Sequence, residues 1–139
     1  MNNTLYYSSI LAGIAILCIS ILGYNRKWIP LYVATYIAIF TSIVNHGTTN
    51  QIARIMDRVT ICIVAIIYLY YISRIGDFRY KFAAYSILGI MILSYFYSKT
   101  LSLIKISPGV NLPDKNQTHF LSHMLAVVLF GILTVSLPR

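Results

Sequence analysis

Long apolar runs separated by polar connectors, of which only the fourth is long, are the dominant pattern of this chain. Each run approaches the roughly 20 residues that an α-helix needs to cross the apolar part of a bilayer at about 1.5 Å per residue. Pro30 stands at the entry to the second run, and Gly47 and Asn50 bracket a very short turn into the third. We therefore predict five transmembrane helices, at about residues 5–24, 31–49, 52–73, 80–98 and 118–137.

The composition supports this interpretation. Hydrophobic residues make up 58% of the 139-residue chain and charged residues only 10%, which is more apolar than a soluble domain of this size tolerates. The sequence contains neither a long polar stretch nor a detectable internal repeat. We expect an all-α membrane helical bundle that forms one transmembrane domain over residues 1–139, so that any active site is built from the helices.

The net charge of +8, from 11 basic and 3 acidic residues, is explained by the positions of the basic side chains. Most flank the apolar runs, as residues that anchor helices to lipid headgroups do, so we expect no nucleic-acid partner. The basic residues of the connectors favour a non-cytoplasmic N-terminus and a cytoplasmic C-terminus. Two N-x-T sequons, at Asn2 and Asn116, agree with that orientation.

The two cysteines, Cys18 and Cys62, lie singly within apolar runs and lack the C-x-x-C spacing of a metal or redox pair. We therefore expect them to be small packing residues.

The three histidines converge if five helices alternate across the membrane. His46 then ends the second helix, while His119 and His123 lie in the first two turns of the fifth, and these ends share one surface in either orientation. Residues four apart lie on one helix face, so His119 and His123 can bind one ion, and Ser42 shares a face with His46.

Three neutral imidazoles with one open position form a zinc site of the catalytic type. Asp57 lies about a turn and a half into the third helix, at the same surface. It is placed to hydrogen-bond a zinc-bound water. Ionisable residues inside membrane spans are candidates for function.

Two alternatives apply to these residues. A histidine in a membrane span more often hydrogen-bonds a neighbouring helix than binds a metal. Asp57 has Arg54 and Arg58 as helix neighbours, and it could simply pair with one of them.

The motif Ser42-x-x-x-His46, then Asp57, then His119-x-x-x-His123 resembles the signature of the CREST superfamily of membrane hydrolases. This group includes alkaline ceramidases and adiponectin receptors, and the eleven-residue step from His46 to Asp57 resembles the ceramidase branch. The resemblance implies that the three histidines bind Zn²⁺, with Asp57 and Ser42 acting around the metal-bound water.

The chain also departs from that family. CREST proteins have seven helices, and a loss of two preserves the side from which the last helix enters. Arg58 and Ser122 stand where ceramidases usually have glutamate and tryptophan, and no acidic residue precedes Asp57. The resemblance therefore leaves the lipid substrate open.

The leading hypothesis is a zinc-dependent intramembrane hydrolase of a lipid amide or ester, in which the zinc-bound water attacks the carbonyl and Asp57 acts as base. The apolar helix faces would hold an acyl chain that enters sideways from the bilayer, and Arg54 or Arg58 would contact an anionic headgroup. A homo-oligomer is compatible with this interpretation. The alternatives are a bis-histidine haem protein for electron transfer and a non-enzymatic, receptor-like protein with structural zinc.

Overall fold

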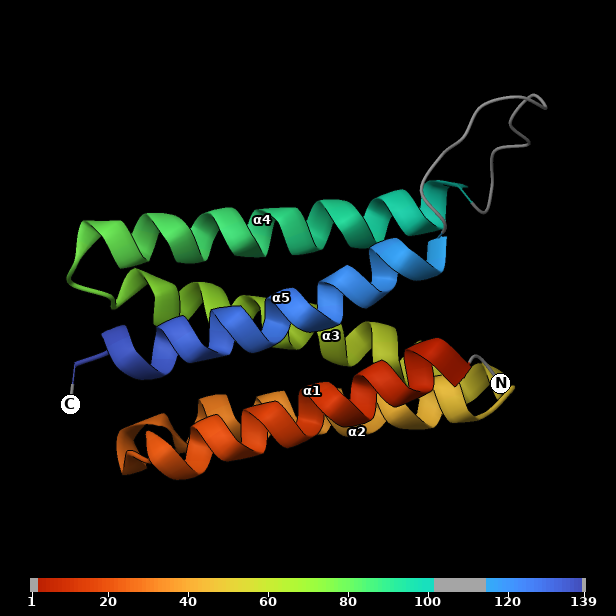
Figure 1. The fold of residues 1–139 in the computed structure, drawn as a ribbon, viewed down its shortest axis with the longest axis horizontal. Helices are drawn as coiled ribbons and strands as arrows, with labels where there is room; N and C mark the ends of the chain where they lie inside the picture. Colours follow the sequence, from red (N-terminus) through yellow and green to blue (C-terminus); the bar gives the residue numbers. More distant parts are fainter. Residues whose placement is uncertain (1–2, 102–114, 139) are drawn as a thin grey trace.

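The computed structural model describes residues 3–101 and 115–138, and it describes their side chains at 3–97 and 118–138. The predicted all-α bundle of five helices is confirmed, and each helix boundary lies within three residues of its predicted position. The two sequon asparagines and the basic residues of the fourth connector lie outside the described side chains. The elements are α1 (Asn3–Leu22), the short 3₁₀ helix η1 (Arg26–Trp28), α2 (Ile29–Gly47), α3 (Gln51–Ser73), α4 (Phe78–Leu101) and α5 (Lys115–Ser136) (Figure 1).

Polar side chains set the helix starts. The Asn50 Oδ1 atom accepts a hydrogen bond from the Ile52 amide at 2.8 Å, which caps α3. Asp77 does the same for α4 through the Arg79 amide at 2.7 Å. Pro30 lies in the first turn of α2, where its missing N–H removes no helical hydrogen bond. The first three connectors can therefore be short, and the helices that they join lie antiparallel.

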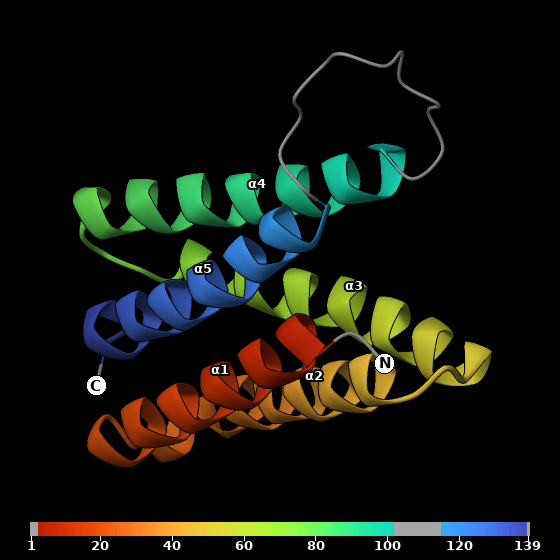
Figure 2. The ribbon, with the colours of Figure 1, turned by 45° about the vertical axis from the view of Figure 1, so that its right-hand side comes forward.

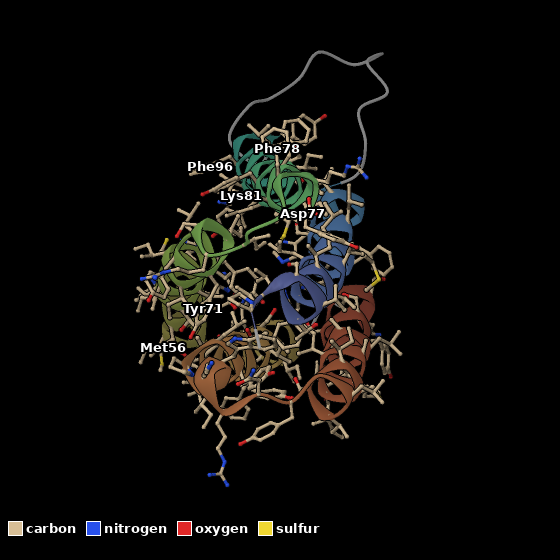
Figure 3. All side chains as sticks on the ribbon, turned by 90° about the vertical axis from the view of Figure 1, so that its left-hand side faces the viewer. Met56, Tyr71, Asp77, Phe78, Lys81 and Phe96 are labelled. Atoms are coloured by element: carbon tan, nitrogen blue, oxygen red, sulfur yellow. The ribbon has the colours of Figure 1, made fainter. Side chains whose placement is uncertain are left out.

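The helices form a ring in which α1 packs between α2 and α5, and α5 packs between α1 and α4 (Figure 3). Of the neighbouring pairs around the ring, α3 and α4 make the smallest contact. Small side chains allow α1 to approach its neighbours closely: a Cβ atom on Gly13 would lie 3.0 Å from the Ile39 Cγ2 atom of α2. The N-terminus lies at the end where α2 meets α3, and the C-terminus lies at the opposite end (Figures 1 and 2).

The densely packed core occupies the end of the bundle that is remote from the histidines. Phe130, Leu31 and Ile72 are completely buried there, and Tyr32 packs its ring on Phe130 with centroids 5.8 Å apart. Because all five helices contribute to this cluster, it fixes their relative positions. The other end of the bundle is thereby left for polar residues.

Four helices are long and apolar enough to cross a membrane: α1, η1 with α2, α3, and residues Thr118–Ser136 of α5. The remaining helix, α4, has 24 residues, but its tyrosines and Lys81 lower its hydropathy, so the fifth span stays a prediction. Large apolar side chains cover the outside of the bundle, as a lipid-facing surface requires. The expectation that Cys18 and Cys62 are small packing residues is wrong, because both side chains are exposed.

Candidate metal centre

The histidine cluster, defined here as His46, His119 and His123, lies where α2 ends and α5 begins. His46 is one residue from the end of α2, and the other two lie one turn apart near the start of α5. The predicted convergence of these residues is therefore present in the structure. It requires both the antiparallel alternation of the helices and the ring closure that sets α5 against α1.

The three imidazole rings face one another at close range. The ring centroids are 5.0 Å apart for His46 and His119, 5.7 Å for His46 and His123, and 5.0 Å for His119 and His123. The rings meet edge to face rather than stacking. One potential ligand atom from each ring lies within 4.8 Å of the other two. Three nitrogen donors thus surround one point in space.

The hydrogen bonds of His123 determine which of its nitrogens can act as a ligand. The Ser8 hydroxyl donates its only proton to the Leu5 carbonyl at 2.9 Å, and its Oγ atom lies 2.8 Å from the His123 Nδ1 atom. With the Ser8 proton directed to Leu5, the Ser8 oxygen accepts the Nδ1–H proton of a neutral His123. This assignment leaves the lone pair on Nε2, the nitrogen that lies 3.4 Å from the Ser42 Oγ atom.

A second serine extends this network. The Ser9 hydroxyl also donates to the Leu5 carbonyl, at 2.8 Å, and its oxygen lies 3.3 Å from the Ser42 Oγ atom. Ser42 can therefore direct its proton either to Ser9 or to His123. If a cation takes the His123 lone pair, the Ser42 proton still has an acceptor in Ser9.

Asp57 is buried, with 2% of its surface exposed. Its Oδ2 atom accepts a hydrogen bond from the Asn45 side-chain amide at 2.7 Å. Asn45 directly precedes His46, so this bond ties α3 to the end of α2 beside the histidine cluster. Asp57 itself does not line the cavity described below. Arg54 and Arg58, predicted to contact a headgroup, are exposed and also lie outside the cavity lining.

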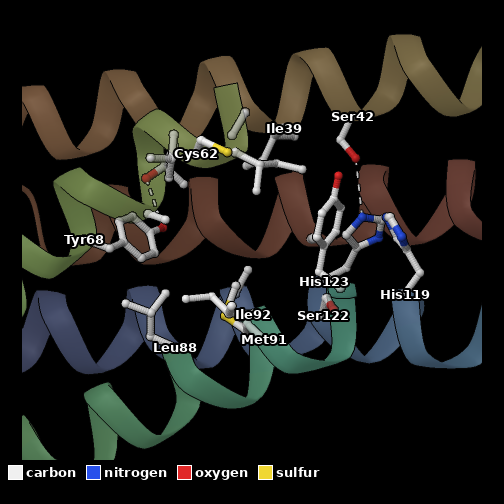
Figure 4. A pocket seen from close by; sticks show the side chains of 18 of the residues that line it. Ile39, Ser42, Cys62, Tyr68, Leu88, Met91, Ile92, His119, Ser122 and His123 are labelled. Atoms are coloured by element: carbon white, nitrogen blue, oxygen red, sulfur yellow. Dashed lines mark hydrogen bonds between the residues drawn. The ribbon is translucent and has the colours of Figure 1, made fainter. Parts of the chain in front are cut away.

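A cavity of about 420 Å³ runs inside the ring and ends at two members of the histidine cluster, His119 and His123, whereas His46 does not belong to its lining (Figure 4). His119, His123 and Ser42 stand at one end of it. Tyr68 stands at the other, where its hydroxyl lies 3.1 Å from the Thr35 Oγ1 atom. Between these ends the lining is apolar, with contributions from all five helices. The cavity therefore has a polar end beside the histidines and an apolar middle.

Sequence reasoning missed Ser8, Ser9 and Asn45 as residues of the site. A signal for the serines was present, because α1 begins at the same surface as α5 and Ser8 and Ser9 are adjacent hydroxyls within an otherwise apolar run. Which histidine they contact depends on the packing of α1 against α5. The predicted residues Ser42, His119 and His123 line one cavity end.

Comparison of the chain with protein-family profiles, characterised proteins and solved structures finds no match. The resemblance to the CREST superfamily therefore depends on the motif residues alone.

Proposed function

We propose that this protein is a zinc-dependent hydrolase that cleaves an amide or ester bond of a membrane lipid. One observation carries the proposal: three histidine ligand atoms lie within 4.8 Å of one another, and two of these histidines, His119 and His123, line the end of an apolar cavity of about 420 Å³. A cluster of nitrogen donors suits an ion that acts on a carbonyl group, and an apolar cavity suits the chain attached to that group.

The donor set fits zinc. Three imidazoles with a fourth position open to substrate are typical of catalytic zinc sites, whose bonds of 2.0–2.1 Å place tetrahedral ligand atoms about 3.3 Å apart. Modest rotations of the histidine side chains would bring atoms that lie within 4.8 Å of one another to that spacing. The contact with Ser8 supports binding, because it presents the Nε2 lone pair of His123 to the cluster.

In the proposed reaction a bound zinc ion would polarise the lipid carbonyl and lower the pKa of a water molecule toward about 7. Asp57 accepts the proton of this water as the water oxygen bonds to the carbonyl carbon, and it returns the proton to the amine or alcohol that leaves when the C–N or C–O bond breaks. The Asn45 amide at 2.7 Å holds the Asp57 carboxylate in place. Ser42 stabilises the oxyanion through its hydroxyl, with its Oγ atom 3.4 Å from His123 Nε2. The roles of Asp57 and Ser42 follow the CREST resemblance residue by residue.

The geometry favours this function over the two alternatives. A haem takes two axial histidines on opposite faces of a flat ring, whereas all three imidazoles here surround one point. A purely structural zinc site is normally closed by four protein ligands. Among the described residues, the grouping of metal-ligating side chains contains three histidines.

The test combines metal analysis with lipid hydrolysis. Purified protein should contain about one zinc per chain, and His46→Ala should lose it. Leu121→Ala is the matched control, since Leu121 is exposed on α5 between the two histidine turns. With a panel of lipid amides and esters, wild type should release a free fatty acid and Asp57→Asn should not. Zinc content that His46→Ala leaves unchanged would refute the proposed site.

A further inference from the structure

The walls of the cavity differ in their exposure to the surroundings. The residues contributed by α1, α2 and α5 are buried or half-buried. Four residues that α3 and α4 contribute to the lining are instead exposed on the outer surface: Cys62, Ile66, Ile92 and Phe96. Ile66 and Phe96 expose 66% and 62% of their surfaces. A side chain that both lines a cavity and is exposed outside marks an edge of an opening.

This α3–α4 opening coincides with the weakest contact in the ring. Neighbouring helices elsewhere are closely packed, whereas α3 and α4 touch least. The opening also lies far from either end of the bundle. Cys62 is eleven residues from each end of the 23-residue α3, which is about 16 Å from each end at 1.5 Å per residue.

The depth of the opening restricts what can pass through it. The α3 helix is long and apolar enough to cross a membrane, and the hydrocarbon region of a bilayer is about 30 Å thick. The midpoint of such a helix therefore faces the centre of the bilayer. Lipid chains are the material present at that depth, and water-soluble ligands are excluded from it.

We propose that the cavity binds a single acyl chain, which enters from the bilayer between α3 and α4 past Cys62. The chain lies along the apolar lining, and the head of the lipid lies toward the histidine cluster. The placement of the head rests on the proposed hydrolase function. Occupation of the cavity by a chain does not, since the lining between the cavity ends is apolar without any metal.

The probe for this proposal is a diazirine analogue of lauric acid, added to the purified full-length protein in lipid nanodiscs and activated by light. Crosslinked residues are mapped by mass spectrometry. We expect adducts on interior residues such as Met91 and Ile39, in addition to adducts on the lipid-facing surface. Adducts confined to the surface in the wild-type protein would overturn the proposal without recourse to any variant.

A pair of matched variants tests the route. Cys62→Trp places a bulky ring at the α3–α4 opening, and Cys18→Trp places the same ring on the exposed face of α1. The first should lose most interior adducts and keep the surface adducts, and the second should keep both. Unchanged interior adducts in a folded Cys62→Trp protein would refute entry at this position.

The same mapping on His46→Ala protein separates the two proposals. Interior adducts without bound zinc or hydrolysis would support the acyl-binding cavity while the hydrolase proposal fails. Hydrolysis by the wild-type protein with no interior adducts would support the hydrolase proposal and refute the acyl-binding cavity.

Discussion

Removal of the Ser8 hydroxyl should weaken zinc binding although Ser8 is not a predicted ligand. Ser8 is 1% exposed and accepts the His123 Nδ1–H proton at 2.8 Å. In Ser8→Ala the buried Nδ1–H group of His123 loses its hydrogen-bond acceptor, which costs about 1–3 kcal/mol. The imidazole can then turn or change tautomer. Loss of an outer-shell partner typically lowers metal affinity about 10–100-fold, which corresponds to about 1.4–2.8 kcal/mol. We therefore expect the Kd for zinc to rise about 10–100-fold in Ser8→Ala.

The assay is a zinc titration of metal-free protein against a competing chelator. Ser20→Ala is the matched control, because Ser20 is also buried on α1 and donates to a backbone carbonyl, that of Ile16 at 2.7 Å. If Ser8 acts through His123, the substitution should have no further effect in a His123→Ala background. A Kd in Ser8→Ala within about twofold of the Ser20→Ala value would refute the argument, since the expected loss is at least about tenfold.

Three further predictions concern the other parts of the site. Tyr68→Ala should open the remote end of the cavity and shift acyl preference to longer chains, whereas Tyr68→Phe, which loses only the contact with Thr35 at 3.1 Å, should not. A chain-length series of substrates or photoprobes checks this, and identical profiles for the two variants would contradict it. Asn45→Ala should lower kcat by about 10–100-fold with zinc content unchanged, because a hydrogen bond to a charged group contributes about 1.5–3 kcal/mol; an unaltered kcat would show that the Asn45 contact with Asp57 is dispensable. Removal of zinc with a chelator should lower the Tm, since a metal present at 100 times its Kd stabilises the folded state by about 2.7 kcal/mol, and equal Tm values with and without metal would argue against a site in the folded protein.

Helix number and the end of the bundle at which each residue lies were predictable from the sequence. Apolar runs of membrane-spanning length locate helices because the backbone must satisfy its own hydrogen bonds in lipid. Alternation of five such helices then places His46 and the start of α5 at the same end of the bundle whatever the packing. The helix ends were predicted to within three residues, since Pro30, Gly47 and Asn50 act locally.

The order of the helices around the ring was not predictable, because it depends on which faces fit together. All-round apolar helices such as α1 carry little directional pattern, so their buried face is decided by small residues that permit close approach, such as Gly13 against Ile39. The errors about Cys18 and Cys62 have the same origin. Both are apolar in character, and lipid accepts such a side chain as readily as the protein interior does.

The sequence by itself determined that this chain is a bundle of apolar helices with three histidines at one end, because hydropathy and helical periodicity are local properties. Only the tertiary structure decided that Ser8 contacts His123, that Asn45 contacts Asp57, and that an apolar cavity extends from the histidines to Tyr68. Those contacts join residues from 12 to 115 positions apart. They depend on how each helix is rotated about its own axis, and that rotation is fixed by packing among all five helices.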